Sequence, residues 1–225
     1  DHKYIAELPS DLAQPGTPIA EALDLDDLII DIENKSLTHR PDTFGLIGFA
    51  REVAGILGQP FKNPAIFDGD LATQSEFIRS NSNNTSDIKS PVIEIQDQTL
   101  CPRYSCVIVD QSQLKFDQDS TDFERILTQD GVLLYKSGMR PVSPIVDATN
   151  LTMLETGQPL HAFDYDKFIA IGGTDSPKII VRAAREGEKI TLIDDTEIEL
   201  NTNDIVITSN DIPVALAGAM GGKNT

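Results

Sequence analysis

Five short apolar segments follow one another in the C-terminal third of the chain, and they constrain its fold more than any other feature. Each segment is five to seven residues long, and turn-forming residues separate it from the next. This spacing is typical of β structure. The sequence therefore predicts a β-rich part towards the C-terminus, formed by KIIVRAA, EKITLID, TEIEL, DIVIT and PVALAG.

Helical patterns precede these segments and do not alternate regularly with strands. The clearest helix follows Pro41, with Asp42 as its expected N-cap and Gly58 as the residue that ends it. Further helices are predicted over 122–135 and 144–155, and further strands over 28–32, 92–96 and 104–110. Strands mixed with a few helices, without βαβ alternation, indicate the α+β class.

Charge and hydropathy argue against a nucleic-acid-coating surface and a membrane span. The chain has 225 residues, of which 36 are acidic and 18 basic, so its formal net charge is −18. Broad binding to a nucleic-acid backbone depends on clustered Lys and Arg, and this charge argues against it, although a pocket for a single nucleotide end remains compatible with it. No apolar run reaches the roughly 20 residues of a membrane span. The N-terminal residues show no signal pattern, so the cytoplasm is the expected location.

The cysteines and histidines form no metal-binding pattern. Cys101 and Cys106 are five residues apart, so within a strand they would point to opposite faces. That arrangement suits neither a shared metal nor a local disulfide, and two reduced thiols are expected. The histidines stand at positions 2, 39 and 161, which is not the spacing of a zinc site. No metal is predicted.

The stretch TNLTMLETGQPLHAFD, residues 149–164, concentrates several polar side chains. Thr149 and Asn150 lie in a predicted helix, where such side chains often bond to their own backbone, although Asn150 could instead project into a cleft. His161 follows a Gly-Gln-Pro break, and by its type and neighbours it is a half-buried structural histidine. These residues by themselves leave both a pocket and an ordinary helix and turn open.

Two flanking features could belong to the same pocket. Arg140 precedes the helix that carries Thr149, where an arginine can tie down a loop or bind an anion. Gly218, Gly221 and Gly222 follow an apolar strand, where the backbone either turns tightly or comes close to a ligand. The glycines are not a P-loop, because no GKS or GKT follows. The residues thus suggest a pocket but no reaction.

Several long motifs resemble a known family, in the same order along the chain. IENKSLTHRPDTFGLIGFAREVAGILGQPF resembles part of domain B1 in the β subunit of bacterial phenylalanyl-tRNA synthetase. Four further segments resemble the B3/B4 domain of that subunit: CPRYSCVIV, GMRPVSPIVDATNLTMLETGQPLHAFDYDK, VRAAREGEKITLIDD and PVALAGAMGG. The resemblance extends over residues 20–222.

This resemblance implies that the chain is an internal fragment of a longer subunit. Residues 1–20 would connect from an OB-fold insertion, 21–79 would be part of a small helix-containing B1-like domain, and 80–90 would be a linker. Residues 91–225 would be a C-terminally truncated B3/B4 domain, with mixed α/β structure and a β-sandwich-like sheet core. The parent phenylalanine–tRNA ligase would be an α2β2 tetramer. Its ATP and magnesium would bind at the α subunit, so no cofactor is expected in this chain.

In that family the B3/B4 domain edits, by hydrolysing tyrosine wrongly attached to tRNA(Phe). An apolar pocket built for Phe rejects an added hydroxyl by only about 100-fold, so a second site is needed. By resemblance, His161 and Arg140 would contact the 3′-terminal adenosine and the ester region, and Thr149 and Asn150 would position the ester and the hydrolytic water. Gly218 would offer an N–H to the developing oxyanion, with Gly221 at the same strand end.

One departure from the family leaves alternatives open. The family's glutamate that recognises the tyrosine hydroxyl lies downstream of the glycine-rich turn, and this chain stops at Thr225. The interpretations are an editing domain, a non-editing scaffold or RNA-docking module of the same subunit, and a free-standing hydrolase acting in trans. Whether the fragment is active by itself is open as well.

Overall fold

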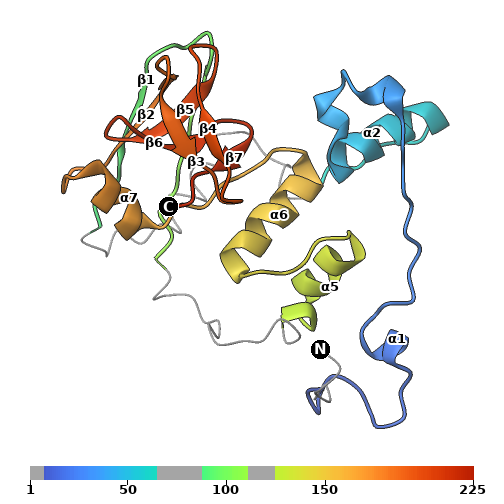
Figure 1. The fold of residues 1–225 in the computed structure, drawn as a ribbon. Coiled ribbons are helices and arrows are strands. Elements are labelled where there is room, and N and C mark those ends of the chain that lie inside the picture. The colour runs from blue at the N-terminus through green and yellow to red at the C-terminus, as the bar shows by residue number, and fades with distance from the viewer. Residues whose placement is uncertain (1–7, 65–87, 111–124) are drawn as a thin grey trace. The chain divides into compact units, whose positions relative to one another are not determined.

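The computed structural model describes residues 8–64, 88–110 and 125–225. They belong to two compact units, each drawn from two stretches of the sequence (Figure 1). Unit 1 lies within Asp1–Asp70 and Lys115–Ala162, and unit 2 within Leu71–Leu114 and Phe163–Thr225. The domain boundaries predicted at 20, 80 and 90 stay a prediction, and residues 80–87 of the predicted linker lie outside the described residues.

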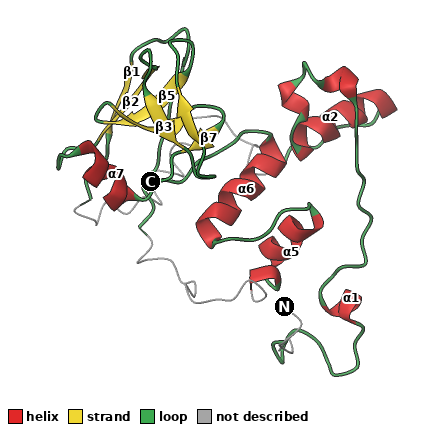
Figure 2. Ribbon diagram, viewed as in Figure 1, coloured by secondary structure: helices red, strands yellow, loops and turns green. Residues whose placement is uncertain are grey.

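The regular elements in the described part of unit 1 are all helices, joined by irregular segments (Figure 2). No helix in the described ranges of the chain combines the length and the apolar character needed to cross a membrane. The elements of unit 1 are α1 (Ile19–Ala22), η1 (Lys35–Leu37), η2 (Pro41–Thr43), α2 (Leu46–Leu57), α5 (Gln129–Lys136) and α6 (Pro144–Thr156).

Helix α2 is the helix predicted after Pro41, but it begins later than expected. It ends at Gly58, whose φ of 62° is the left-handed conformation of a C-terminal glycine. Its N-cap is Gly45 and not Asp42. Asp42 lies in η2, where both of its carboxylate oxygens accept hydrogen bonds from Arg40, at 2.9 and 2.8 Å. The carboxylate is therefore engaged and does not cap α2.

Two predicted strands are absent. The segment Leu28–Ile32 forms no strand, and its apolar side chains are exposed, Leu28 by 80% and Ile30 by 71%. Residues 104–110 likewise form no strand. A strand needs a partner for its backbone groups, and within the described part of the chain no segment pairs with either stretch. Apolar pattern alone was therefore misleading here.

Of the two later helices of unit 1, α6 agrees with prediction and α5 agrees in part. The helix predicted over 122–135 is interrupted at residues 127 and 128, so α5 begins only at Gln129, after the N-cap Thr128, and it ends at Lys136. Residues 122–124 are outside the described part. Helix α6 is capped by Ser143, whose side chain accepts a hydrogen bond from Val146 N, and it starts with Pro144. It ends at Gly157 with φ 76°, as predicted.

Unit 2 contains a mixed five-stranded sheet in the order β1-β2-β5-β6-β7, in which β1 is parallel to β2 and the other pairs are antiparallel. All five C-terminal segments predicted as strands are strands, and the α+β class is confirmed. The strands are β1 (Val92–Ile95), β2 (Lys178–Ala183), β3 (Lys189–Thr191), β4 (Glu197–Glu199), β5 (Ile205–Ser209), β6 (Ile212–Leu216) and β7 (Met220–Gly221).

The sheet is buried on both faces because its strands alternate between two apolar clusters. On one face, Ile179 and Val181 of β2 pack with Phe168 of helix α7 (Tyr165–Gly172). On the other, Val206 of β5 packs with Ile190 of the β3–β4 hairpin. These two clusters make up the core of unit 2.

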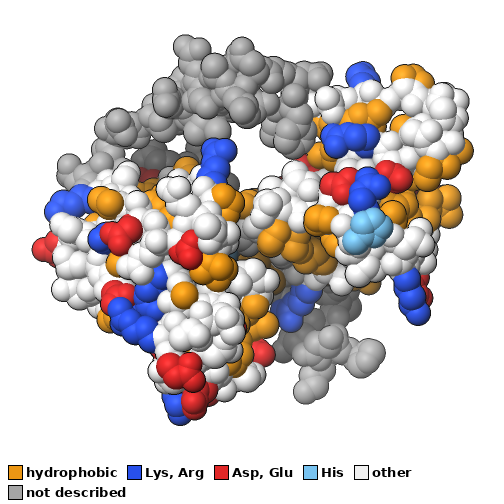
Figure 3. Space-filling model, turned by 90° about the horizontal axis from the view of Figure 1, so that it is seen from above, with side chains coloured by type: hydrophobic (Ala, Val, Ile, Leu, Met, Phe, Trp, Pro, Cys, Tyr) orange, Lys and Arg blue, Asp and Glu red, His pale blue; other side chains and the backbone are white. Residues whose placement is uncertain are grey.

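Unit 1 keeps much of its apolar surface exposed. Hydrophobic side chains gather on the surface of this unit (Figure 3), and around α2 they include Phe44, Leu46, Ile56 and Leu57. Each of these four is 61–75% exposed. One face of α2 therefore belongs to the surface and not to the core, whereas its N-terminal end contacts α6.

Candidate functional site

Helix α6 carries two of the predicted site residues, and both of its ends are fixed. At its start, the buried carboxylate of Asp147 accepts a hydrogen bond from Val142 N at 2.8 Å, which ties the preceding loop to the first helical turn. At its end, Gly157 N donates to Met153 O at 2.8 Å. Thr149 and Asn150 lie between these fixed points, each partly buried.

The two side chains differ in what they can offer. The Thr149 hydroxyl donates to Val146 O at 2.7 Å, the backbone bond expected of a helical threonine. Its proton is committed, so its oxygen can only accept a further hydrogen bond. Within the described residues the Asn150 carboxamide makes no hydrogen bond, so it has both donor and acceptor capacity for a ligand. Together they could orient a water molecule or a sugar hydroxyl.

Arg140 lies in the loop before α6 and is exposed. The next residue, Pro141, is fully buried. Val142 is held on both sides, since its N–H donates to Asp147 and its carbonyl accepts from Arg125 Nη1 at 2.5 Å. The loop is thus fixed, and it presents a permanently charged guanidinium suited to an anionic group.

His161 lies four residues after Gly157, the residue that ends α6. The residue lies at the surface with its ring partly covered, which is compatible with the half-buried position expected for it. Its surroundings still desolvate the ring enough to lower the pKa of His161 below its ordinary value of 6.5. The imidazole is therefore neutral at pH 7 and offers one N–H donor and one nitrogen acceptor.

The glycines of the candidate site lie in unit 2, at the β6–β7 hairpin. Gly218 is an exposed turn residue with φ 72°, and its N–H has no acceptor among the described residues. Gly221 is buried in β7, where its carbonyl accepts from Ile193 N at 3.1 Å. The close backbone approach is at Gly222, where a Cβ would lie 2.6 Å from Val214 O. That approach is a contact inside the sheet.

The predicted site residues fall into two groups. Arg140, Thr149, Asn150 and His161 lie in unit 1, and Gly218 and Gly221 lie in unit 2. That they share one pocket stays a prediction. Within residues 8–64, 88–110 and 125–225, no three His, Cys, Asp or Glu side chains come together as a metal site would require.

Sequence reasoning missed residues that position the site. Asp147 was not singled out, although an acidic residue in the first turn after a Ser-Pro start is a helix N-terminal signal. Asp164 has a structural role as well. In the structure it caps α7, where its carboxylate accepts from Lys167 N at 3.1 Å. An Asp before an apolar helical pattern could have revealed both the cap and the helix.

Comparison with known proteins supplies the class. Residues 100–225, more than half of the chain, match the family model described as the B3/4 domain. The chain therefore belongs to the B3/4 domain family.

The resemblance to the β subunit of phenylalanine–tRNA ligase is confirmed over the whole chain. The chain is 36% identical to the phenylalanine–tRNA ligase beta subunit of Desulfotalea psychrophila over 227 residues, covering all of this chain and 24% of that protein. It is 39% identical to the same subunit of Carboxydothermus hydrogenoformans, covering 95% of this chain and 23% of that one. The Staphylococcus aureus subunit is also 39% identical, over 92% of this chain and 22% of its own length. The chain thus spans about a quarter of the relatives' length.

Proposed function

We propose that this chain is part of a phenylalanine–tRNA ligase β subunit and that its B3/4 region hydrolyses tyrosine misattached to tRNA(Phe). The observation that carries the proposal is the B3/4 match over residues 100–225 of this chain, together with its similarity to proteins named as this subunit. The chemistry of α6 and its flanks supports it, because these residues offer a cation, a neutral imidazole and two hydrogen-bonding side chains.

The proposed mechanism relies on positioning. Asn150 donates to and accepts from the ester and the attacking water, and the Thr149 oxygen accepts from that water. Arg140 holds the phosphate of the terminal nucleotide. Neutral His161 hydrogen-bonds the terminal ribose, and Gly218 N–H stabilises the oxyanion that forms on the ester carbonyl.

The partners follow from the same proposal. The chain binds the acceptor end of tRNA(Phe) and works in an α2β2 complex in the cytoplasm, where ATP and magnesium act at the α subunit. The formal charge of −18 favours contact with only the end of the tRNA. Most contacts to the tRNA backbone are therefore made by other parts of the complex.

A deacylation assay on the complete ligase tests the proposal. Purified Tyr-tRNA(Phe) and Phe-tRNA(Phe) are incubated separately with the enzyme in the absence of ATP, and the remaining ester is counted over time. Rapid loss of tyrosine with retention of phenylalanine supports editing. Loss of neither ester above the spontaneous rate favours the non-editing scaffold.

A further inference from the structure

The His-Arg-Pro-Asp motif at residues 39–42 has no part in the proposed chemistry. In the structure it connects η2 to helix α2. Arg40 Nη2 lies 2.8 Å from Asp42 and 2.9 Å from Glu52, so one guanidinium ties η2 to α2. These carboxylates raise the pKa of Arg40 above its ordinary value. Gly48 of α2 packs directly on the carbonyl of Asp42. The motif and the first turn of α2 are thus one rigid piece.

This piece contacts the end of α6 through two glycines. A Cβ on Gly45 would lie 2.2 Å from Gly157 N and 2.8 Å from Glu155 O. A Cβ on Gly157 would lie 3.1 Å from Gly45 N and 3.4 Å from Pro41 O. All of these neighbours are backbone atoms, which cannot swing aside as a side chain does.

Glycine at position 45 is required by space and not by conformation. Gly45 has φ −131° and ψ 157°, an extended conformation that any residue adopts. A side chain there would push against the last turn of α6. To relieve the overlap with Gly157 N, the two backbones would have to separate by on the order of 1 Å, because carbon and backbone atoms in contact lie about 3.5 Å apart.

Such a shift would reach the candidate site. Asn150 is seven residues before Gly157, roughly 10 Å along the helix at 1.5 Å per residue. His161 is four residues after Gly157. The contact therefore lies between two residues of the proposed pocket, on the same backbone.

We infer that Gly45 and Gly157 form a joint that positions α6, and through it Asn150 and His161, for the deacylation reaction. The inference rests on the proposed function. Gly45 is thereby a positioning residue that does not touch the substrate. The His-Arg-Pro-Asp motif holds the backbone around Gly45 in place.

The matched pair Gly45→Ala and Gly55→Ala tests the joint. Both glycines belong to α2 or its cap, but a Cβ on Gly55 meets nothing within 4 Å. In the complete ligase, Gly45→Ala is expected to lower kcat for Tyr-tRNA(Phe) deacylation about 100-fold with KM unchanged, since misplacement by about 1 Å costs that much. Gly55→Ala is expected to keep the wild-type kcat, because Ala also favours the helix.

Two further measurements make every outcome decisive. If Gly45→Ala does not fold, Gly157→Asn replaces it, since Asn tolerates positive φ but brings a Cβ into the joint. The Cβ on residue 157 would lie 3.1 Å from Gly45 N, a milder overlap than the 2.2 Å contact made by a Cβ on residue 45, so a smaller loss of kcat in that variant supports the contact. A wild-type kcat in whichever variant folds overturns it. Hydrogen exchange of residues 149–157 is measured in parallel. If wild-type ligase deacylates nothing, the proposed function fails, and hydrogen exchange alone then tests the contact. Faster exchange in Gly45→Ala than in Gly55→Ala supports it, and equal exchange in the two variants contradicts it.

Discussion

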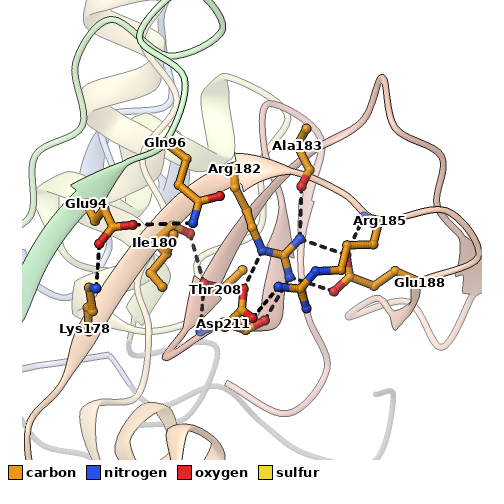
Figure 4. Close-up of polar contacts among 10 residues, drawn as sticks. All are labelled: Glu94, Gln96, Lys178, Ile180, Arg182, Ala183, Arg185, Glu188, Thr208 and Asp211. Carbon is orange, nitrogen blue, oxygen red and sulfur yellow. Dashed lines mark hydrogen bonds and ion pairs between the residues drawn. The ribbon is translucent and has the colours of Figure 1, made fainter.

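Arg182 and Glu188 form a two-bond ion pair inside unit 2. Arg182 Nη1 and Nη2 donate to the two carboxylate oxygens of Glu188 at 2.9 and 2.7 Å, and Arg182 Nε donates to Asp211 at 2.7 Å (Figure 4). Only 4% of Arg182 is exposed. The residue therefore joins strand β2 to the loop before β3 and to the β5–β6 turn.

Replacing this arginine is expected to destabilise the chain strongly. Arg182→Met leaves Glu188 partly buried without its cation, which typically costs about 3 kcal/mol or more. Arg185→Met is the control, because Arg185 also pairs with Asp211 but is 62% exposed, and exposed pairs contribute about 1 kcal/mol or less. Urea unfolding of the two variants gives the comparison. Equal losses would contradict a special role for the buried arginine.

The same network predicts how stability depends on pH. The hydrogen bond from Arg182 holds the pKa of Glu188 below its ordinary value of 4.5, and that from Arg185 holds the pKa of Asp211 below 3.8. Since the folded pKa values are the lower ones, this stabilisation is fully present above about pH 4.5 and is lost as pH falls through the folded values. Urea midpoints from pH 7 to 3 should fall in the wild type and fall less in Arg182→Met. Parallel curves for the two proteins would refute the assignment.

The stability of the loop and first turn at the start of α6 is expected to depend on Asp147. Asp147→Ala leaves the amide of Val142 without its acceptor, at a cost of roughly 1–3 kcal/mol, and releases the loop that presents Arg140. Asp166→Ala serves as the control, because Asp166 lies in the first turn of α7 but is exposed. Thermal unfolding should show a lower Tm for Asp147→Ala only. A similar Tm for both variants would argue against the fixed loop.

Comparing variants of two α6 threonines distinguishes a catalytic role from a role in helix structure. Thr149 and Thr152 both donate their hydroxyl proton to an α6 carbonyl, at 2.7 and 2.8 Å. If the Thr149 oxygen orients the hydrolytic water, Thr149→Ala lowers the deacylation rate at least about tenfold, as loss of a positioned group does. Thr152→Ala leaves the rate unchanged. Equal rates in the two variants would remove Thr149 from the mechanism.

Much of the fold follows from local sequence patterns. The five C-terminal strands and the bounds of α6 are visible in apolar periodicity, in Ser143-Pro144 and in Gly157, because each is set by neighbouring residues. Residues 28–32 show the limit, since their apolar pattern says nothing about whether a pairing segment exists.

The candidate site depends on information that local patterns lack. Thr149 and Asn150 look like ordinary helical residues, and one of them does bond to its own backbone. The residues alone suggested a pocket shared with Gly218 and Gly221, which lie in the other unit, but only the resemblance over long motifs gave that pocket a reaction. The Gly45–Gly157 contact was not foreseen, because it joins residues 112 positions apart whose spacing carries no signal.

The most direct test of the central claim is the rate of Tyr-tRNA(Phe) deacylation by the complete ligase carrying Asn150→Ala or His161→Ala. The proposed site predicts that each variant loses roughly 100-fold or more of the wild-type rate, in line with the loss of a positioned catalytic contact, while formation of Phe-tRNA(Phe) continues. If both variants hydrolyse Tyr-tRNA(Phe) at the wild-type rate, the site is not where these residues lie.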